Sequence, residues 1–142
     1  MNVSTLNPSH LAYAAIRIFL MALLGLPILA WAHSNEHLAT MKGAHGGMLR
    51  MAGNYHFELL IKNGEANVWV TDHGDVPQAT KGAVSTLRIV SGNQTFSLSM
   101  APTGSNGLAI KDARIRPEKG MKLVLTVSMN GEASQHIRFS LD

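Results

Sequence analysis

The chain has 142 residues, a formal net charge of +3 at pH 7 and no cysteine. This length suits one domain, and the absence of cysteine excludes disulfides, thiolate metal sites and a cysteine nucleophile. The weak and evenly spread positive charge, without a basic run, excludes the basic patch of a nucleic-acid-binding protein. The fold must therefore depend on an apolar core.

Residues 1–32 are predicted to be a signal peptide. Arg17 precedes an apolar run from Ile18 to Ala30, and the run ends at Ala30-Trp31-Ala32, which is a small-x-small cleavage pattern. Cleavage would leave a periplasmic protein that begins at His33 and has no stable membrane span. The alternative is a retained anchor, because the apolar residues before Arg17 bring the segment near the roughly 20 residues of a bilayer span.

Residues 33–46 are predicted to be a flexible polar leader. Leu38 and Met41 are its only large apolar side chains, which is too few to hold a segment against a core. The leader contains the histidines His33, His37 and His45.

From residue 47 onward apolar and polar residues alternate, and turn dipeptides recur at short spacing. Residues 47–142 are therefore predicted to be a single β domain without a convincing helix. Asn63-Gly64 and Asn130-Gly131 are strong signals for two-residue hairpins. About eight short strands are expected, and they indicate an all-β fold, either an antiparallel Ig-like β-sandwich or a small barrel.

The expected hairpins set the register of the first three strands. A two-residue turn at Asn63-Gly64 places Glu58 opposite Trp69 and His56 opposite Thr71. A three-residue turn at 52–54 would place Leu49 opposite Phe57 and Met51 opposite Tyr55. Because a slip of one residue exchanges the two faces of a strand, the face away from the core is expected to carry Met48, Arg50, His56, Glu58, Trp69 and Thr71.

Three histidines gather around this sheet. His45 precedes two glycines, His56 lies within a strand, and His73 lies in the turn Asp72-His73-Gly74-Asp75. Imidazole is the commonest side-chain metal ligand. Imidazole and thioether together suit copper, whereas imidazole alone also suits zinc or nickel. The candidate ligands are His45, His56 and His73, with Met48, His37 and His33 as further candidates.

Two further alternatives concern these histidines. A histidine at position 1 of a cleaved chain would offer its amine and Nδ1 to one ion, a nitrogen geometry that suits Cu(II). An exposed sheet face with His, Glu, Arg and Thr is otherwise simply solvated, with weak cross-strand pairs.

His45-Gly46-Gly47, the strand Tyr55-His56-Phe57-Glu58 and the turn Asp72-His73-Gly74 resemble a family of small exported all-β proteins of Gram-negative bacteria. The same pattern is similar to segments of periplasmic adaptor proteins of heavy-metal efflux systems. The resemblance covers roughly Ala44 to the C-terminus. It implies a periplasmic location, binding or buffering of metal ions, and an envelope efflux or accessory protein as a partner.

The sequence thus predicts an exported periplasmic protein that binds copper or another heavy-metal ion and acts in binding, buffering or resistance. The alternative is a non-catalytic accessory domain of an envelope complex with incidental histidines. The sequence contains no HExxH, no nucleophile elbow and no phosphate-cradling glycine loop. An enzyme is therefore not expected.

Overall fold

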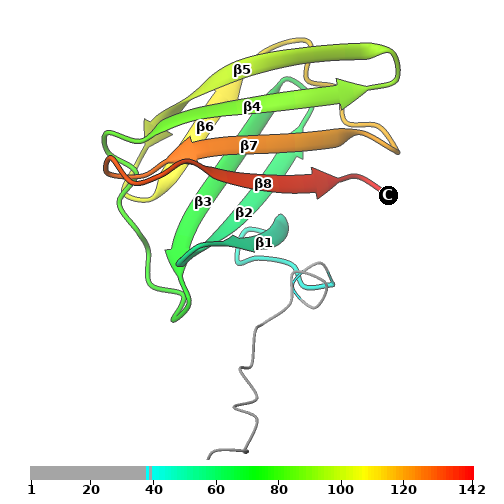
Figure 1. Ribbon diagram of the computed structural model, residues 1–142. Coiled ribbons are helices and arrows are strands. Elements are labelled where there is room, and N and C mark those ends of the chain that lie inside the picture. Colours follow the sequence, from blue (N-terminus) through cyan, green and yellow to red (C-terminus); the bar gives the residue numbers. More distant parts are fainter. Residues whose placement is uncertain (1–37, 39) are drawn as a thin grey trace, which may run out of the picture. The chain divides into compact units, whose positions relative to one another are not determined.

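The alternating segments of the sequence form eight antiparallel strands (Figure 1). The computed structural model describes Leu38 and residues 40–142; the predicted signal peptide, His33 and His37 lie outside these described residues. Among the described residues, no helix has the length and apolar character that a membrane crossing requires. The strands are β1 (Met48–Ala52), β2 (Tyr55–Lys62), β3 (Glu65–Asp72), β4 (Val84–Ser91), β5 (Gln94–Thr103), β6 (Gly107–Lys111), β7 (Lys122–Ser128) and β8 (Gln135–Ser140).

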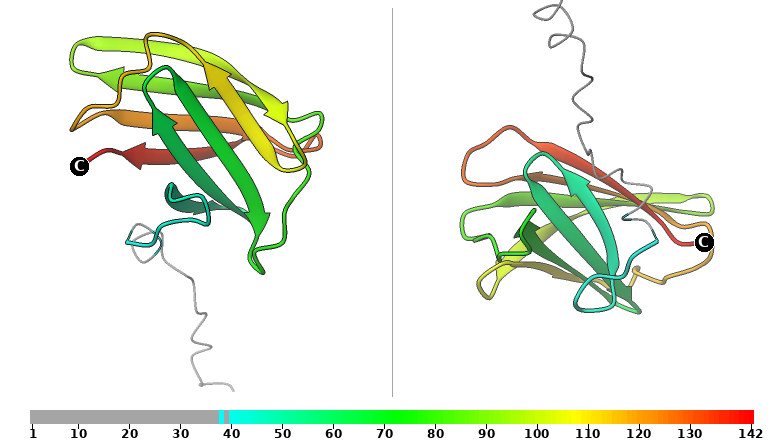
Figure 2. Two further views of the ribbon diagram at one scale, coloured as in Figure 1. Left: turned by 180° about the vertical axis from the view of Figure 1, so that it is seen from behind. Right: turned by 90° about the horizontal axis from the view of Figure 1, so that it is seen from below.

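One sheet contains all eight strands, in the order β1-β2-β3-β6-β5-β4-β7-β8. The long strand β5 joins its two halves, since residues 94–100 pair with β4 and residues 101–103 pair with β6. The sheet curls until β1 contacts β8, so it is a nearly closed barrel (Figure 2). The all-β prediction is confirmed, in its small-barrel form.

The core fills the inside of this sheet. Phe57, Leu59, Val68 and Val70 are fully buried, as the alternation of β2 and β3 predicts. The predicted register of this hairpin is confirmed, with Glu58 opposite Trp69 and His56 opposite Thr71. Only Gly64 of the Asn63-Gly64 turn has a positive φ. The turn therefore differs from the type that needs positive φ at both central residues.

The predicted register of β1 is wrong by one residue. The turn to β2 contains only Gly53 and Asn54, because Ala52 pairs with Tyr55. Gly53 has a φ of +56°, and a glycine at the first central position is typical of a type II′ two-residue turn. The shift exchanges the faces of β1. Met48 now lies opposite Leu59 and packs against the core, and Met51 lies opposite His56.

The second predicted hairpin has its two-residue turn at Asn130-Gly131, but the connection between the paired strands β7 and β8 is longer than this turn. Asn130 and Gly131 both have positive φ, and Glu132 N–H donates to the Met129 carbonyl, which closes a tight turn. The last strand pair, however, is Val127 with Gln135. One extra residue therefore follows the turn on the β8 side, as in a bulge.

Strand β2 is buried on both faces, which alternation alone does not predict. His56 is 9% exposed and Glu58 is 5% exposed, although both point away from the core. Residues 40–47, here called the covering loop, lie over Glu58, and the turn after β3 lies beside His56. The predicted leader therefore ends in a segment with defined contacts, because the sheet offers it a hydrogen-bonding carboxylate.

Candidate metal site

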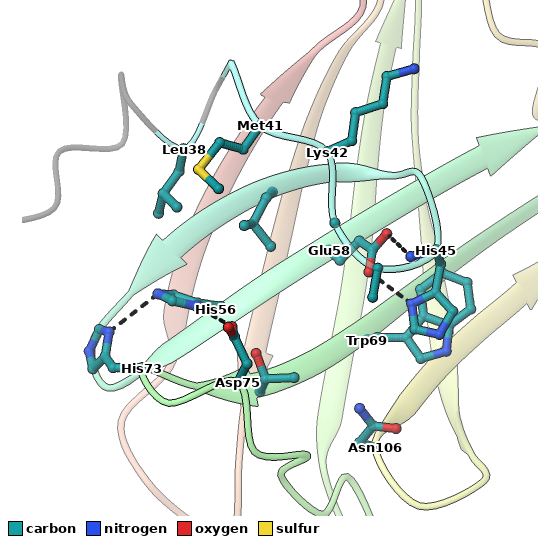
Figure 3. Close-up of a pocket in the computed structure, with 14 residues that line it drawn as sticks. Leu38, Met41, Lys42, His45, His56, Glu58, Trp69, His73, Asp75 and Asn106 are labelled. Atoms are coloured by element: carbon teal, nitrogen blue, oxygen red, sulfur yellow. Dashed lines mark hydrogen bonds and ion pairs between the residues drawn. The ribbon is translucent and has the colours of Figure 1, made fainter.

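A pocket of about 480 Å³ lies on the outer face of β1–β3, under the covering loop (Figure 3). The strands contribute half-buried and buried side chains to its floor, and the covering loop and the turn after β3 form its walls. Its lining residues are Leu38, Met41, Lys42, Gly43, Ala44, His45, Leu49, His56, Glu58, Trp69, Thr71, His73, Asp75 and Asn106.

Glu58 holds the covering loop. Its Oε1 accepts hydrogen bonds from the backbone N–H groups of His45 and Gly47, both at 2.8 Å. Its Oε2 lies 2.8 Å from His45 Nδ1. A buried carboxylate needs such partners, because an unpaired buried charge is strongly unfavourable. Three donors from one short loop satisfy this carboxylate.

The glycines of the His-Gly-Gly motif allow this close approach. Gly46 has a φ of +81°, a conformation that favours glycine. A Cβ on Gly47 would lie 2.6 Å from the carbonyl oxygen of Leu59, and a Cβ on Gly43 would overlap the Glu58 carboxyl group. The motif therefore shapes a loop that fits tightly against β2.

The His45 ring is fixed on two sides. It stacks on the Trp69 indole, with ring centroids 3.8 Å apart and planes 7° apart. Because the Glu58 carboxylate accepts a hydrogen bond, Nδ1 is the donor in this contact, and Nε2 is the nitrogen that the neutral ring would offer to a metal. A carboxylate on one imidazole nitrogen commonly orients the other nitrogen toward a metal. The His45 side chain is 44% exposed.

His56 and His73 contact each other directly. His73 Nδ1 lies 3.3 Å from His56 Nε2, and the two rings meet edge to face with centroids 5.0 Å apart. On its other side, His56 Nδ1 is buried without a hydrogen-bond partner among the described residues. Asp75 Oδ1 lies 3.5 Å from this atom, which is close enough for attraction but does not form a hydrogen bond.

The turn after β3 places His73 and Asp75. Asp72 Oδ1 accepts hydrogen bonds from Gly74 N–H at 2.8 Å and Val76 N–H at 3.0 Å, and its Oδ2 accepts one from Gln78. These bonds, the Val76 bond first, hold the pKa of Asp72 below its usual value. Asp75 adopts a φ of +60°, which aspartate tolerates better than most residues. The turn is thus built by its own side chains.

The structure brings the three central predicted histidines to one pocket but divides them into two groups. Figure 3 shows His45 with Glu58 and Trp69 on one side and His56 with His73 on the other. Within the described part of the chain, no three side chains among His, Asp, Glu and Cys form a group arranged to hold a metal ion. Met48 lies on the core side, and His33 and His37 are outside the described residues.

Sequence reasoning missed two parts of the pocket. Leu38 is 6% exposed, whereas the sequence showed it only as one of two large apolar side chains in the leader. Asp75 was noted only as part of a turn motif, and its approach to His56 follows from the turn conformation. The two adjacent glycines after His45 were the available signal for a loop that packs closely against a strand.

No family model, curated protein or solved structure matches this chain.

Proposed function

We propose that this protein is an exported periplasmic metal-binding protein that takes up copper or another heavy-metal ion, in a binding, buffering or resistance role and without catalysis. The observation that carries the proposal is the 3.3 Å separation of His56 Nε2 and His73 Nδ1. Two nitrogens at the usual 2.0–2.1 Å from a tetrahedral ion lie about 3.3–3.4 Å apart. The histidine pair, His56 and His73, already has the spacing of two ligands to one ion.

The surroundings of the pair support the same proposal. An ion bound at His56 Nε2 requires the proton of this ring to sit on Nδ1, the atom that lacks a partner. Asp75 Oδ1 lies 3.5 Å away and is the acceptor that this proton needs. Such a carboxylate–histidine–metal arrangement orients the ring and strengthens it as a ligand. The carboxylates of Glu58 and Asp75 also make the pocket favourable for a cation.

His45 has a separate place in this proposal. Its Nδ1 is held by Glu58 on the far side of the pocket from the histidine pair (Figure 3). The sequence suggested one ion shared by His45, His56 and His73. The geometry instead supports the pair as the primary site, with His45 as an oriented single donor nearby.

Calorimetric titration of Cu(II), Zn(II) and Ni(II) into the protein tests the proposal. We expect His73→Ala to weaken binding strongly, and His73 is exposed, so this change leaves the fold intact. The matched control is His136→Ala, since His136 is also exposed but contacts Thr126 on the β7–β8 ladder. Equal binding by the wild type and His73→Ala would favour the accessory-domain alternative.

A further inference from the structure

The pairing of β1 with β2 places a thioether beside the histidine pair. Met51 lies directly opposite His56 in the ladder, and the Cβ atoms of such partners are about 4.5–5.5 Å apart. We infer that Met51 Sδ is a third ligand beside His56 Nε2 and His73 Nδ1, and that the site therefore selects Cu(I). This inference rests on the proposed metal-binding function.

The position of Met51 on the outer face follows from its neighbours. Met48 and Ala52 both pack against the core, and side chains of a strand alternate between the two faces. Leu49, two residues before Met51, lines the pocket. Met51 is half-buried, and its side chain lies on the same face as His56 because the two residues are direct partners. It lines a neighbouring hollow together with Arg50 and Arg138, so its sulfur would turn toward the histidine pair when an ion binds.

The corrected register also changes which side chain lies directly opposite His56. The expected pairs, Leu49 with Phe57 and Met51 with Tyr55, would have placed Arg50 opposite His56, and a guanidinium directly opposite His56 would repel a metal cation. In the structure Arg50 points to the other face, where its guanidinium lies 5.8 Å from the centre of the Phe139 ring. A flexible, polarisable thioether takes the position instead.

The types of the ligand atoms determine which metal ion the site binds most tightly. Two imidazoles alone suit zinc, nickel or copper, whereas thioether sulfur is a soft ligand that favours Cu(I). Methionine has three rotatable side-chain bonds, so its sulfur adjusts to an ion at the adjacent imidazole without a change in the strands. A site with two nitrogens and one sulfur therefore binds Cu(I) more tightly than a site with the two nitrogens alone, while Zn(II) gains little.

The test is an anaerobic titration of Cu(I) in competition with the chelator bicinchoninate, together with a Zn(II) titration. Met51→Leu keeps the apolar volume and removes the sulfur. We expect it to weaken Cu(I) binding by at least about 10- to 100-fold, the size of a ligand-shell defect, and to leave Zn(II) binding nearly unchanged. Met48→Leu, in the same strand but on the core face, is the matched control and changes neither affinity.

X-ray absorption at the copper edge gives an independent reading. The Cu(I)-loaded protein is expected to show one sulfur neighbour, which Met51→Leu loses. Unchanged Cu(I) affinity and an unchanged spectrum in Met51→Leu would overturn the inference, as would an effect of Met41→Leu in its place, since Met41 lines the same pocket. If the wild type binds neither Cu(I) nor Zn(II), the proposed function itself fails.

Discussion

Glu58, in the middle of β2, binds His45 through both its backbone and its ring. The two oxygens of its carboxylate lie 2.8 Å from His45 N and from His45 Nδ1. These residues are separated by 13 positions in the sequence. This one carboxylate therefore links the covering loop to the barrel and fixes the orientation of a candidate ligand.

We expect Glu58→Gln to release the covering loop. An amide NH₂ in place of one carboxylate oxygen would face N–H donors, and a buried donor without an acceptor costs about 1–3 kcal/mol. The free energy of unfolding, measured in urea, should fall by this amount, and the near-ultraviolet circular dichroism of the His45–Trp69 stack should weaken. Glu118→Gln is the control, because Glu118 is exposed and contacts Ser91 far from the loop. An unchanged near-ultraviolet spectrum would contradict the described loop contacts.

Substitutions of Gly46 and Gly47 should have different effects, because alanine at position 46 is unfavourable for its backbone conformation and alanine at position 47 for its overlap with β2. Gly46→Ala meets no atom within 4 Å, so only its positive φ is unfavourable, by about 1–2 kcal/mol. Gly47→Ala brings a Cβ to 2.6 Å from the Leu59 carbonyl oxygen, and we expect it to displace the loop and weaken the hydrogen bonds to Glu58. Thermal unfolding and the near-ultraviolet spectrum of the two variants test this order. A milder effect for Gly47→Ala would show that the loop lies further from β2.

The register of β1 can be tested by cross-linking, because the chain has no cysteine of its own. Met51 and His56 are direct partners, and a disulfide requires Cα atoms about 4.4–6.8 Å apart. We expect the double variant Met51→Cys/His56→Cys to form a disulfide on mild oxidation. The pair Arg50→Cys/His56→Cys, which the sequence-based register would favour, should remain reduced in a free-thiol assay. The reverse result would restore the earlier register.

The turn that carries His73 should depend on the charge of Asp72. Hydrogen bonds from Val76 and Gly74 lower the pKa of Asp72 from its usual 3.8. A carboxyl group with a lowered folded pKa stabilises the fold above its unfolded pKa, and this contribution is lost as the pH falls through the folded value. The turn is therefore held at neutral pH and loosens only in acid below about pH 4. The Gly74 amide signal in nuclear magnetic resonance spectra should shift in that range.

At neutral pH, Asp72→Ala should weaken metal binding by displacing His73, by about 10- to 100-fold as for other changes next to a ligand. Asp112→Ala is the matched control, since Asp112 forms the same kind of turn with Arg114. Metal affinity should also fall as the pH is lowered, because a protonated imidazole cannot bind a metal ion. Equal affinity in Asp72→Ala and the wild type would mean that His73 is not a ligand.

The processing prediction concerns residues outside the described structure. The Ala30-Trp31-Ala32 pattern predicts cleavage before His33. N-terminal sequencing of protein isolated from the envelope should begin at His33. A full-length product in the membrane fraction would support the retained anchor instead.

Local patterns in the sequence were sufficient to predict the fold class, most strand positions and the β2–β3 hairpin. Phe57, Leu59, Val68 and Val70 repeat with the period of a strand, and a one-residue slip would bury polar side chains in their place. These are local signals, because alternation and turn residues act over a few positions. They also brought His45, His56 and His73 to attention as histidines near one sheet.

The arrangement of those histidines depends on contacts between segments that are distant in the sequence. The turn at Gly53-Asn54 is one residue shorter than expected, which sends Met48 to the core and sets Met51 against His56. The expected turn would pair Leu49 with Phe57, whereas the observed turn pairs Arg50 with Phe57. Matching apolar partners across the two strands therefore favoured the wrong turn length. The division of the site between Glu58–His45 and His56–His73 depends on hydrogen bonds across 13 and 17 residues of sequence. Such contacts form only when the loop and the turn fold onto the outer face of β2, and no local pattern specifies them.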